Sequence, residues 1–156
     1  MLARSLLIAS TVVLLLALSV AGAAASPPVD VEITVDSTIP SDGGPSYGPF
    51  TARGPAVEAG VICPSGDTFE TFGKGTGFQS NSGFNFQVIK RFTCADGSGT
   101  FLVKMQVRVD HKGDNFSWNI VGGTGAYERL HGAGQGIAPA TPTGVLGMLS
   151  GRVHID

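Results

Sequence analysis

Hydrophobic and polar residues alternate along several stretches of this chain, with the period of two that is typical of half-buried β-strands. In the clearest stretch, 100–110, the apolar side chains point to one side and the polar ones to the other, with Leu102 as the exception. The other predicted strands are 29–36, 50–54, 56–62, 68–72, 84–93, 116–121, 126–130, 134–137 and 145–155. No window long enough for a helix shows helical apolar spacing, and turn residues separate the stretches. The pattern predicts an all-β domain, either a sandwich or a closed barrel.

The segment 116–136, FSWNIVGGTGAYERLHGAGQG, joins an aromatic strand to a glycine-rich turn and a second short strand. The predicted turn consists of Gly122, Gly123, Thr124 and Gly125. We expect at least one of Gly123 and Gly125 to hold a positive φ, which carries no Cβ penalty in glycine. After the strand 126–130, glycines at alternate positions from 132 to 136 leave one face without side chains, on which a backbone or a large aromatic can approach closely.

This segment resembles the closing half of the allene oxide cyclase and dirigent barrel superfamily, in which GGTG or GGSG is followed by an aromatic, an aliphatic and a glycine-containing strand. The matching residues are Gly122, Gly123, Thr124, Gly125, Tyr127, Leu130 and Gly132, and the final GVLGMLSGRVHID ends the chain as the last strand of the family does. The resemblance implies a single antiparallel closed β-barrel of about eight strands. No cyclase or dirigent catalytic motif aligns, so the resemblance carries the fold and not the chemistry.

The N-terminus carries an apolar, uncharged run after Arg4 that ends in small residues before Ser26. This pattern predicts a signal peptide over 1–25, cleaved between Ala25 and Ser26, and a secreted barrel domain over 26–156. The alternative is a membrane anchor, because the run 6–25 could just span a bilayer. No Lys or Arg stop follows the run, so we expect cleavage and no stable membrane insertion afterwards.

The chain has 10 Lys and Arg against 12 Asp and Glu, and 23 glycines among 156 residues. A mildly acidic protein without a basic run has no electrostatic reason to bind nucleic acid, and none is expected as a partner. Cys63 and Cys94 are its two cysteines, each beside a turn sequence. In a secreted protein such a pair predicts a disulfide bond, with two unrelated buried thiols as the alternative.

Motifs for catalysis are missing from the sequence. The three histidines, at 111, 131 and 154, have no metal-ligand spacing, and no GxSxG nucleophile motif occurs. The GKGTG stretch at 73–77 is not a phosphate loop, because its lysine precedes the glycines that it should follow. The sequence therefore predicts no catalytic residue, no metal site and no cofactor.

Lys90 is the charged residue whose position matches an apolar strand face. In an apolar lumen the pKa of its amine would be lowered and the amine could act as a base or nucleophile, unless the side chain extends to the rim. The hydroxyl of Tyr127 could donate to a bound carbonyl, or could instead be held by the backbone. Together with Phe86, Met105 and Trp118, these two residues form the predicted lining of a ligand site in the lumen.

Three function classes follow from these features. The favoured one is a secreted barrel that binds a small hydrophobic molecule or a partner surface without turning it over. The alternatives are an isomerase or cyclase that acts on an apolar substrate by confinement, and an envelope-associated structural protein whose barrel is filled. An open lumen lined by Lys90, Tyr127 and Trp118 would favour the first two classes. Asn115 begins an NFS glycosylation sequon, which matters only in a eukaryotic host.

Overall fold

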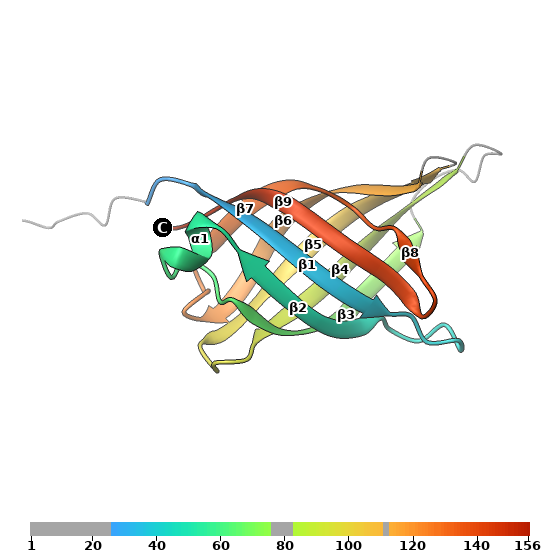
Figure 1. Cartoon of the computed structure of the whole chain (residues 1–156), viewed down its shortest axis with the longest axis horizontal. Helices are drawn as coiled ribbons and strands as arrows, with labels where there is room; N and C mark the ends of the chain where they lie inside the picture. The colour runs from blue at the N-terminus through green and yellow to red at the C-terminus, as the bar shows by residue number, and fades with distance from the viewer. Residues whose placement is uncertain (1–25, 76–82, 111–112) are drawn as a thin grey trace, which may run out of the picture.

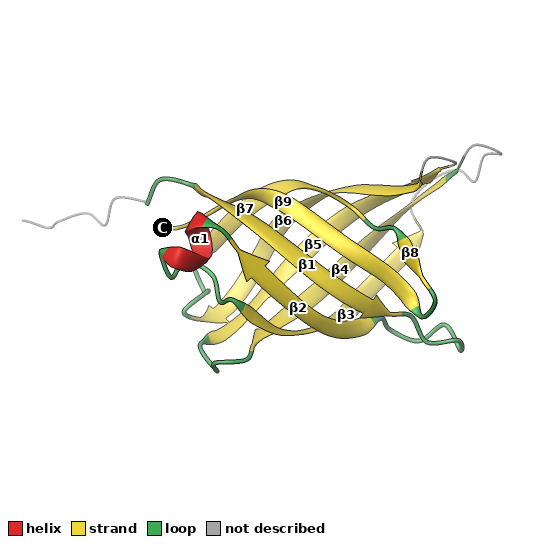
Figure 2. Cartoon of the chain, viewed as in Figure 1, coloured by secondary structure: helices red, strands yellow, loops and turns green. Residues whose placement is uncertain are grey.

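The computed structural model describes residues 26–75, 83–110 and 113–156 (Figure 1). Over these residues the chain forms one antiparallel β-sheet in which most strands neighbour each other in chain order. The strands are β1 (Val29–Thr38), β2 (Tyr47–Arg53), β3 (Ser65–Gly75), β4 (Phe84–Cys94), β5 (Gly99–Asp110), β6 (Gly113–Gly125), β7 (Leu130–Ile137), β8 (Ala140–Thr141) and β9 (Gly144–Ile155). Within these described ranges, helix is limited to α1 (Pro55–Glu58), as Figure 2 shows.

The sheet closes because β1 pairs with β2 along one side and with β9 along the other. Strand β7 pairs with the later part of β9, from Met148 to Ile155, and the short β8 pairs with its first residues. The described chain is therefore a closed barrel of eight antiparallel strands plus one extra strand, which confirms the predicted fold class.

Closure also brings the two ends of the described chain together beside α1. The Ser26 hydroxyl donates to the Ile155 carbonyl oxygen at 2.9 Å, and the Ile155 N–H donates to the same hydroxyl at 3.2 Å. Both ends therefore lie at one end of the barrel, as Figure 1 shows for the C-terminus.

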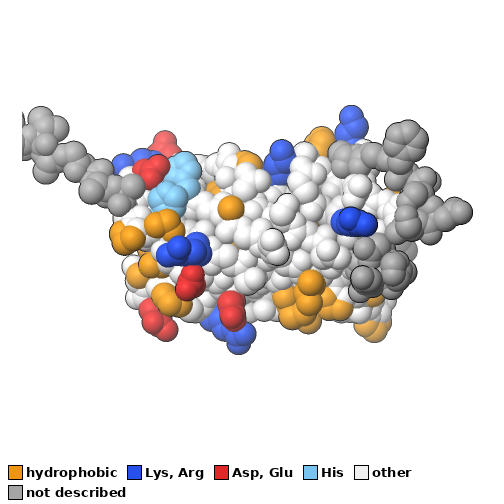
Figure 3. Space-filling model, turned by 90° about the horizontal axis from the view of Figure 1, so that it is seen from above, with side chains coloured by type: hydrophobic (Ala, Val, Ile, Leu, Met, Phe, Trp, Pro, Cys, Tyr) orange, Lys and Arg blue, Asp and Glu red, His pale blue; other side chains and the backbone are white. Residues whose placement is uncertain are grey.

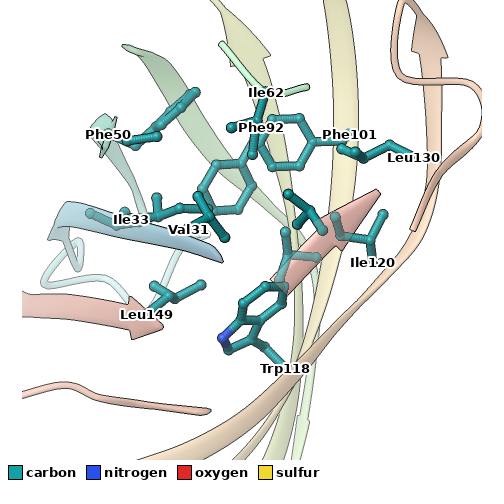
Figure 4. Close-up of a cluster of buried hydrophobic side chains, with 14 of the residues drawn as sticks. Val31, Ile33, Phe50, Ile62, Phe92, Phe101, Trp118, Ile120, Leu130 and Leu149 are labelled. Atoms are coloured by element: carbon teal, nitrogen blue, oxygen red, sulfur yellow. The ribbon is translucent and has the colours of Figure 1, made fainter. Parts of the chain in front are cut away.

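The end of the barrel beside α1 is filled by aromatic rings. Phe50, Phe92 and Phe101 are fully buried, with ring centroids 4.8–6.0 Å apart. Figure 4 shows Ile62 next to Phe92 and Leu130 next to Phe101, so aliphatic side chains close the gaps between the rings. This half of the lumen is a packed core.

Cys63 and Cys94 form a disulfide bond at the same end, with Cα atoms 6.0 Å apart, which confirms the predicted pair. Both residues are buried, at 3% and 4% exposure. The bond ties the segment after α1 to the end of β4, and so holds that segment over the aromatic core.

The predicted strand 56–62 is wrong, because α1 and the turns after it occupy this segment. Gly54 has a φ of 101°, which ends the extended course of β2. Pro55 follows at the start of the helix, where its missing N–H costs no hydrogen bond.

Among the residues that the structure describes, no helix has the length and apolarity to cross a bilayer.

The predicted strand 126–130 is also wrong. Strand β6 continues through the expected turn to Gly125, with a bulge at Val121, and the reversal lies at 126–129. The φ of Gly125 is +62°, which confirms that one of the two glycines holds a positive φ. The N–H groups of Ala126 and Tyr127 then bond to the carbonyls of Ser98 and Thr124, so this backbone cannot join a strand ladder.

The glycines of β7 and β9 form a bare inner face on which aromatic rings lie. The glycines are Gly132, Gly134 and Gly136 on β7, and Gly147 and Gly151 on β9. Trp118 is in register with Gly134, which is in register with Gly151. The indole N–H of Trp118 donates to the carbonyls of Gln135 and Ser150 at 3.1 and 3.2 Å. The expectation that the glycine row admits a large aromatic is confirmed.

Candidate ligand-binding cavity

The half of the barrel away from α1 is hollow. A cavity of about 310 Å³, here called the cup, lies inside it near β8 and the segment after β1. Its walls are mostly apolar, and their apolar side chains are those of Val35, Ile39, Phe86, Val88, Met105, Val107, Phe116, Ala138, Val145 and Leu149. A larger hollow of about 700 Å³ lies on the outer face of the barrel, open to solvent, among polar side chains such as Gln106, Ser117 and Gln135. The cup is the less open of these two hollows.

The strand registers bring the polar residues of the cup together. The alternation of β1 continues past Val35, so Ser37 points inward and is buried. Lys90 lies on the inner side of β4 in register with Glu70 of β3. Glu70 continues the inward alternation from the buried Thr68 and faces the cup, and a bulge between Glu70 and Phe72 then shifts the register, which leaves Phe72 exposed.

Lys90 is 7% exposed, and its ammonium donates to the Ser37 hydroxyl at 2.7 Å. The carboxylate of Glu70 is held by Ser46, because its Oε2 accepts a hydrogen bond from the hydroxyl of Ser46 at 2.7 Å and another from the N–H of Ser46 at 3.2 Å. Burial lowers the pKa of Lys90 to about 8, and the negative charge of Glu70 offsets part of this effect. Lys90 therefore lies inside the lumen and does not extend its amine to the solvent at the rim.

The five predicted ligand-contacting residues separate into two groups. Phe86, Lys90 and Met105 line the cup. Trp118 lies opposite Met105 in register, on the glycine face beside the cup, and is not part of its lining. Tyr127 is at the filled end, where its ring packs against Phe101 at 5.7 Å. The structure therefore corrects the expectation that all five share one lumen site.

The Tyr127 hydroxyl is already engaged in a hydrogen bond. It lies 2.9 Å from the hydroxyl of Ser98, which in turn donates to the Asp96 carboxylate. This chain of hydrogen bonds closes the 95–98 turn at the filled end of the barrel. Tyr127 is thus positioned for packing, and no group of the cup reaches it.

Four polar residues that line the cup were not predicted from the sequence: Ser37, Ser46, Glu70 and Asp114. Ser37 could have been found, because it continues the inward alternation of Val31, Ile33 and Val35. Glu70 could not, because Phe69 and Phe72 on either side of it are exposed, so apolar residues do not mark the inner face of this strand.

The described histidines lie together on the outer surface, as the pale blue patch of Figure 3 shows. His131 and His154 stack at 5.4 Å, and their Nε2 atoms lie 3.0 and 3.4 Å from the Asp156 carboxylate. Across the ranges that the structure describes, no group of three or more His, Cys, Asp or Glu side chains is arranged to hold a metal ion. His111 lies outside these ranges.

Comparison with known proteins finds no matching family model, no similar curated protein and no similar solved structure. The class of protein is therefore defined by the described residues alone: a closed antiparallel eight-stranded barrel, packed at one end and hollow at the other. The resemblance to the allene oxide cyclase and dirigent superfamily stays a prediction from the GGTG segment.

Replacing Lys90 by methionine should change how stability depends on pH. The unfolded side chain keeps its proton up to the ordinary pKa of 10.5, whereas the folded one loses it above about 8. Between these values the unfolded state binds more protons, so the free energy of unfolding of the wild-type protein rises with pH. Between neutral pH and pH 10.5, we expect the free energy of unfolding of the wild-type protein to rise by up to about 3 kcal/mol relative to that of Lys90→Met.

Urea unfolding of both proteins across this pH range measures the difference. The other charged side chains that line the cup, Glu70 and Asp114, are present in both proteins. A difference in unfolding free energy that stays constant with pH would show that Lys90 is solvated in the folded state.

Proposed function

We propose that the protein binds a small, largely apolar molecule in the cup, without turning it over. The observation that carries this proposal is a partly open cavity of about 310 Å³ with mostly apolar walls and a buried Lys90–Ser37 pair. Small-molecule sites combine these features, because apolar walls supply affinity and a few placed polar groups fix orientation.

The walls favour an aliphatic or terpenoid-like body for this molecule. Side chains such as Val88, Met105 and Leu149 offer no hydrogen bonds, so affinity must come from the apolar area removed from water, at about 25 cal/mol per Å². A molecule with several polar groups would leave some of them unpaired against these walls, at a cost of about 1–3 kcal/mol for each group.

The polar cluster favours one neutral head group. The positive charge of Lys90 is already balanced in part by Glu70, directly across in the strand register. A carboxylate ligand would therefore meet Glu70 as well as Lys90, whereas a hydroxyl or carbonyl oxygen can accept from Lys90 or Ser37 without adding a charge. We infer that the ligand is an apolar alcohol, aldehyde or ketone.

The structural alternative fits the cup less well than a binding function does. A purely structural barrel would need no cavity of this size, since eight strands can be filled by side chains. A cyclase or isomerase could use the same cup by confining a reactive substrate, and turnover of an apolar substrate would be its sign. Secretion rests on the predicted signal peptide, which lies outside the described residues, and we keep it as part of the proposal.

Filling the cup should abolish binding. Gly147 lines the cup, and a Cβ atom built on it would lie 3.6 Å from the nearest atom, which is ordinary contact. Gly147→Leu should therefore fold while its side chain occupies the cavity. With 1-octanol as the probe, we expect the wild-type melting temperature to rise by about 3–8 °C at saturation and that of Gly147→Leu to stay unchanged.

Gly122→Leu is the matched control. Gly122 lies on the outer face opposite Leu102, and its Cβ would also meet only open space or ordinary contact. This variant should respond to 1-octanol as the wild-type protein does. An equal response of all three proteins would place the alcohol outside the cup, and no response in any of them would overturn the proposal.

A further inference from the structure

We propose that Lys90 captures small apolar aldehydes and ketones covalently, as an imine, inside the cup. This inference rests on the proposed function, because the carbonyl compound must enter the same cavity. It goes beyond that function because it assigns a reversible chemical step to one side chain.

The geometry presents the Lys90 amine to the cavity. Phe86, Val88 and Lys90 follow one another at alternate positions on β4 and all three line the cup. The amine is thus the polar end of an otherwise apolar wall, in which Val88 and Phe86 are in register with Met105 and Val107 of β5. A compound whose body packs against these side chains has its carbonyl group directed to the only ammonium among the described lining residues.

The condensation needs no co-reactant. The lone pair of the neutral amine attacks the carbonyl carbon, a C–N bond forms, and the carbonyl oxygen takes up a proton to give a carbinolamine. The hydroxyl then leaves as water with a second proton from nitrogen, and the C=N bond forms. One aldehyde and one amine give one imine and one water, without oxidation or reduction.

Two neighbours of Lys90 assist these steps. The hydroxyl of Ser37, 2.7 Å from Nζ, can pass a proton between nitrogen and the carbonyl oxygen. The carboxylate of Glu70, across in register, balances the positive charge of a protonated imine. Burial supports the step further, because it lowers the pKa of Lys90 to about 8 and so raises the share of nucleophilic amine near neutral pH.

Reductive trapping tests the proposal on the wild-type protein. The protein is incubated with octanal, the imine is reduced with sodium cyanoborohydride, and the product is analysed by intact mass and peptide mapping. We expect one adduct per chain, at Lys90, formed at least about 10-fold faster than at Lys104, a lysine on the outer face of β5. Predominant modification of Lys104 or other outer lysines, with Lys90 unmodified, would overturn the proposal.

Variants identify the origin of the adduct. Lys90→Arg keeps a cation in the cup but cannot form an imine, and should remove the rapid adduct. Gly147→Leu, which fills the cup, should slow trapping at Lys90 to the rate of Lys104, whereas Gly122→Leu should not. A rapid adduct that persists in Gly147→Leu would show that the reaction occurs outside the cup and would contradict the proposal.

Binding of 1-octanol separates this inference from the proposed function. If 1-octanol binds in the cup and octanal is not trapped at Lys90, the imine step is wrong and the binding function stands. If neither compound enters the cup, both are overturned. Trapping at Lys90 that 1-octanol inhibits by competition supports both.

Discussion

Gly134→Val should prevent folding or lower the free energy of unfolding by about 4 kcal/mol or more. A Cβ atom at Gly134 would overlap the carbonyl oxygen of Ser150 and lie 2.7 Å from the Cα of Gly151 and 2.8 Å from the indole of Trp118. The first two are backbone atoms of the paired strand, so no rotamer change can relieve the overlap. Relief would require β7 and β9 to separate, which would also open the barrel and break the indole hydrogen bonds.

Urea unfolding followed by circular dichroism measures this effect, with Gly122→Val as the control. Gly122 is in the same sheet, but its nearest neighbour for an added Cβ is the flexible end of Leu102 at 3.9 Å. The control should unfold within about 1 kcal/mol of the wild-type protein, since a β-branched residue suits a strand. Similar midpoints for both variants would show that the bare inner face is not required for packing.

Removal of the disulfide bond should lower the free energy of unfolding by about 3.7 kcal/mol. The bond joins residues 31 positions apart, and the chain-entropy relation gives this value for the loop it closes. The double variant Cys63→Ala/Cys94→Ala should show this loss in full. Both residues lie at the filled end and neither lines the cup, so ligand binding at low denaturant should survive.

The matched comparison uses the reductant itself. Reduction should shift the unfolding midpoint of the wild-type protein to that of the double variant, and should leave the midpoint of the double variant unchanged. If the double variant unfolds at the wild-type midpoint, the bond does not constrain the unfolded chain and the aromatic core alone holds this end of the barrel.

Alternation was enough to predict the all-β class and most of the strands, because it reports directly which side of a strand is buried. The choice of a closed barrel over a sandwich came from the resemblance of the GGTG segment. Alternation failed at 56–62 and 126–130, two short segments in which apolar and polar residues mix as they do in a strand. At the first, the backbone of Gly54 and the ring of Pro55 decide the outcome; at the second, the φ of Gly125 does. Local backbone geometry at a few glycines and prolines overrode side-chain pattern.

The candidate site was predictable only in part, for a different reason. Alternation tells which side chains face inward but not how far along the barrel they lie. Phe86, Lys90 and Met105 fall at the hollow end, whereas Tyr127 faces inward at the packed end. Depth depends on strand tilt and register, and the bulge after Glu70 shows how one extra residue changes the register.

The hydrogen-bonded pair of Ser26 and Ile155 has a practical consequence for handling the protein. Any tag, tether or fusion partner joined at residue 26 or 156 emerges beside α1, at the end of the barrel away from the cup. A protein immobilised through either end would thus present its cavity to the surrounding solution. The proximity of Ser26 and Ile155 also allows them to be linked by a short peptide, so that new ends could be opened elsewhere in the chain.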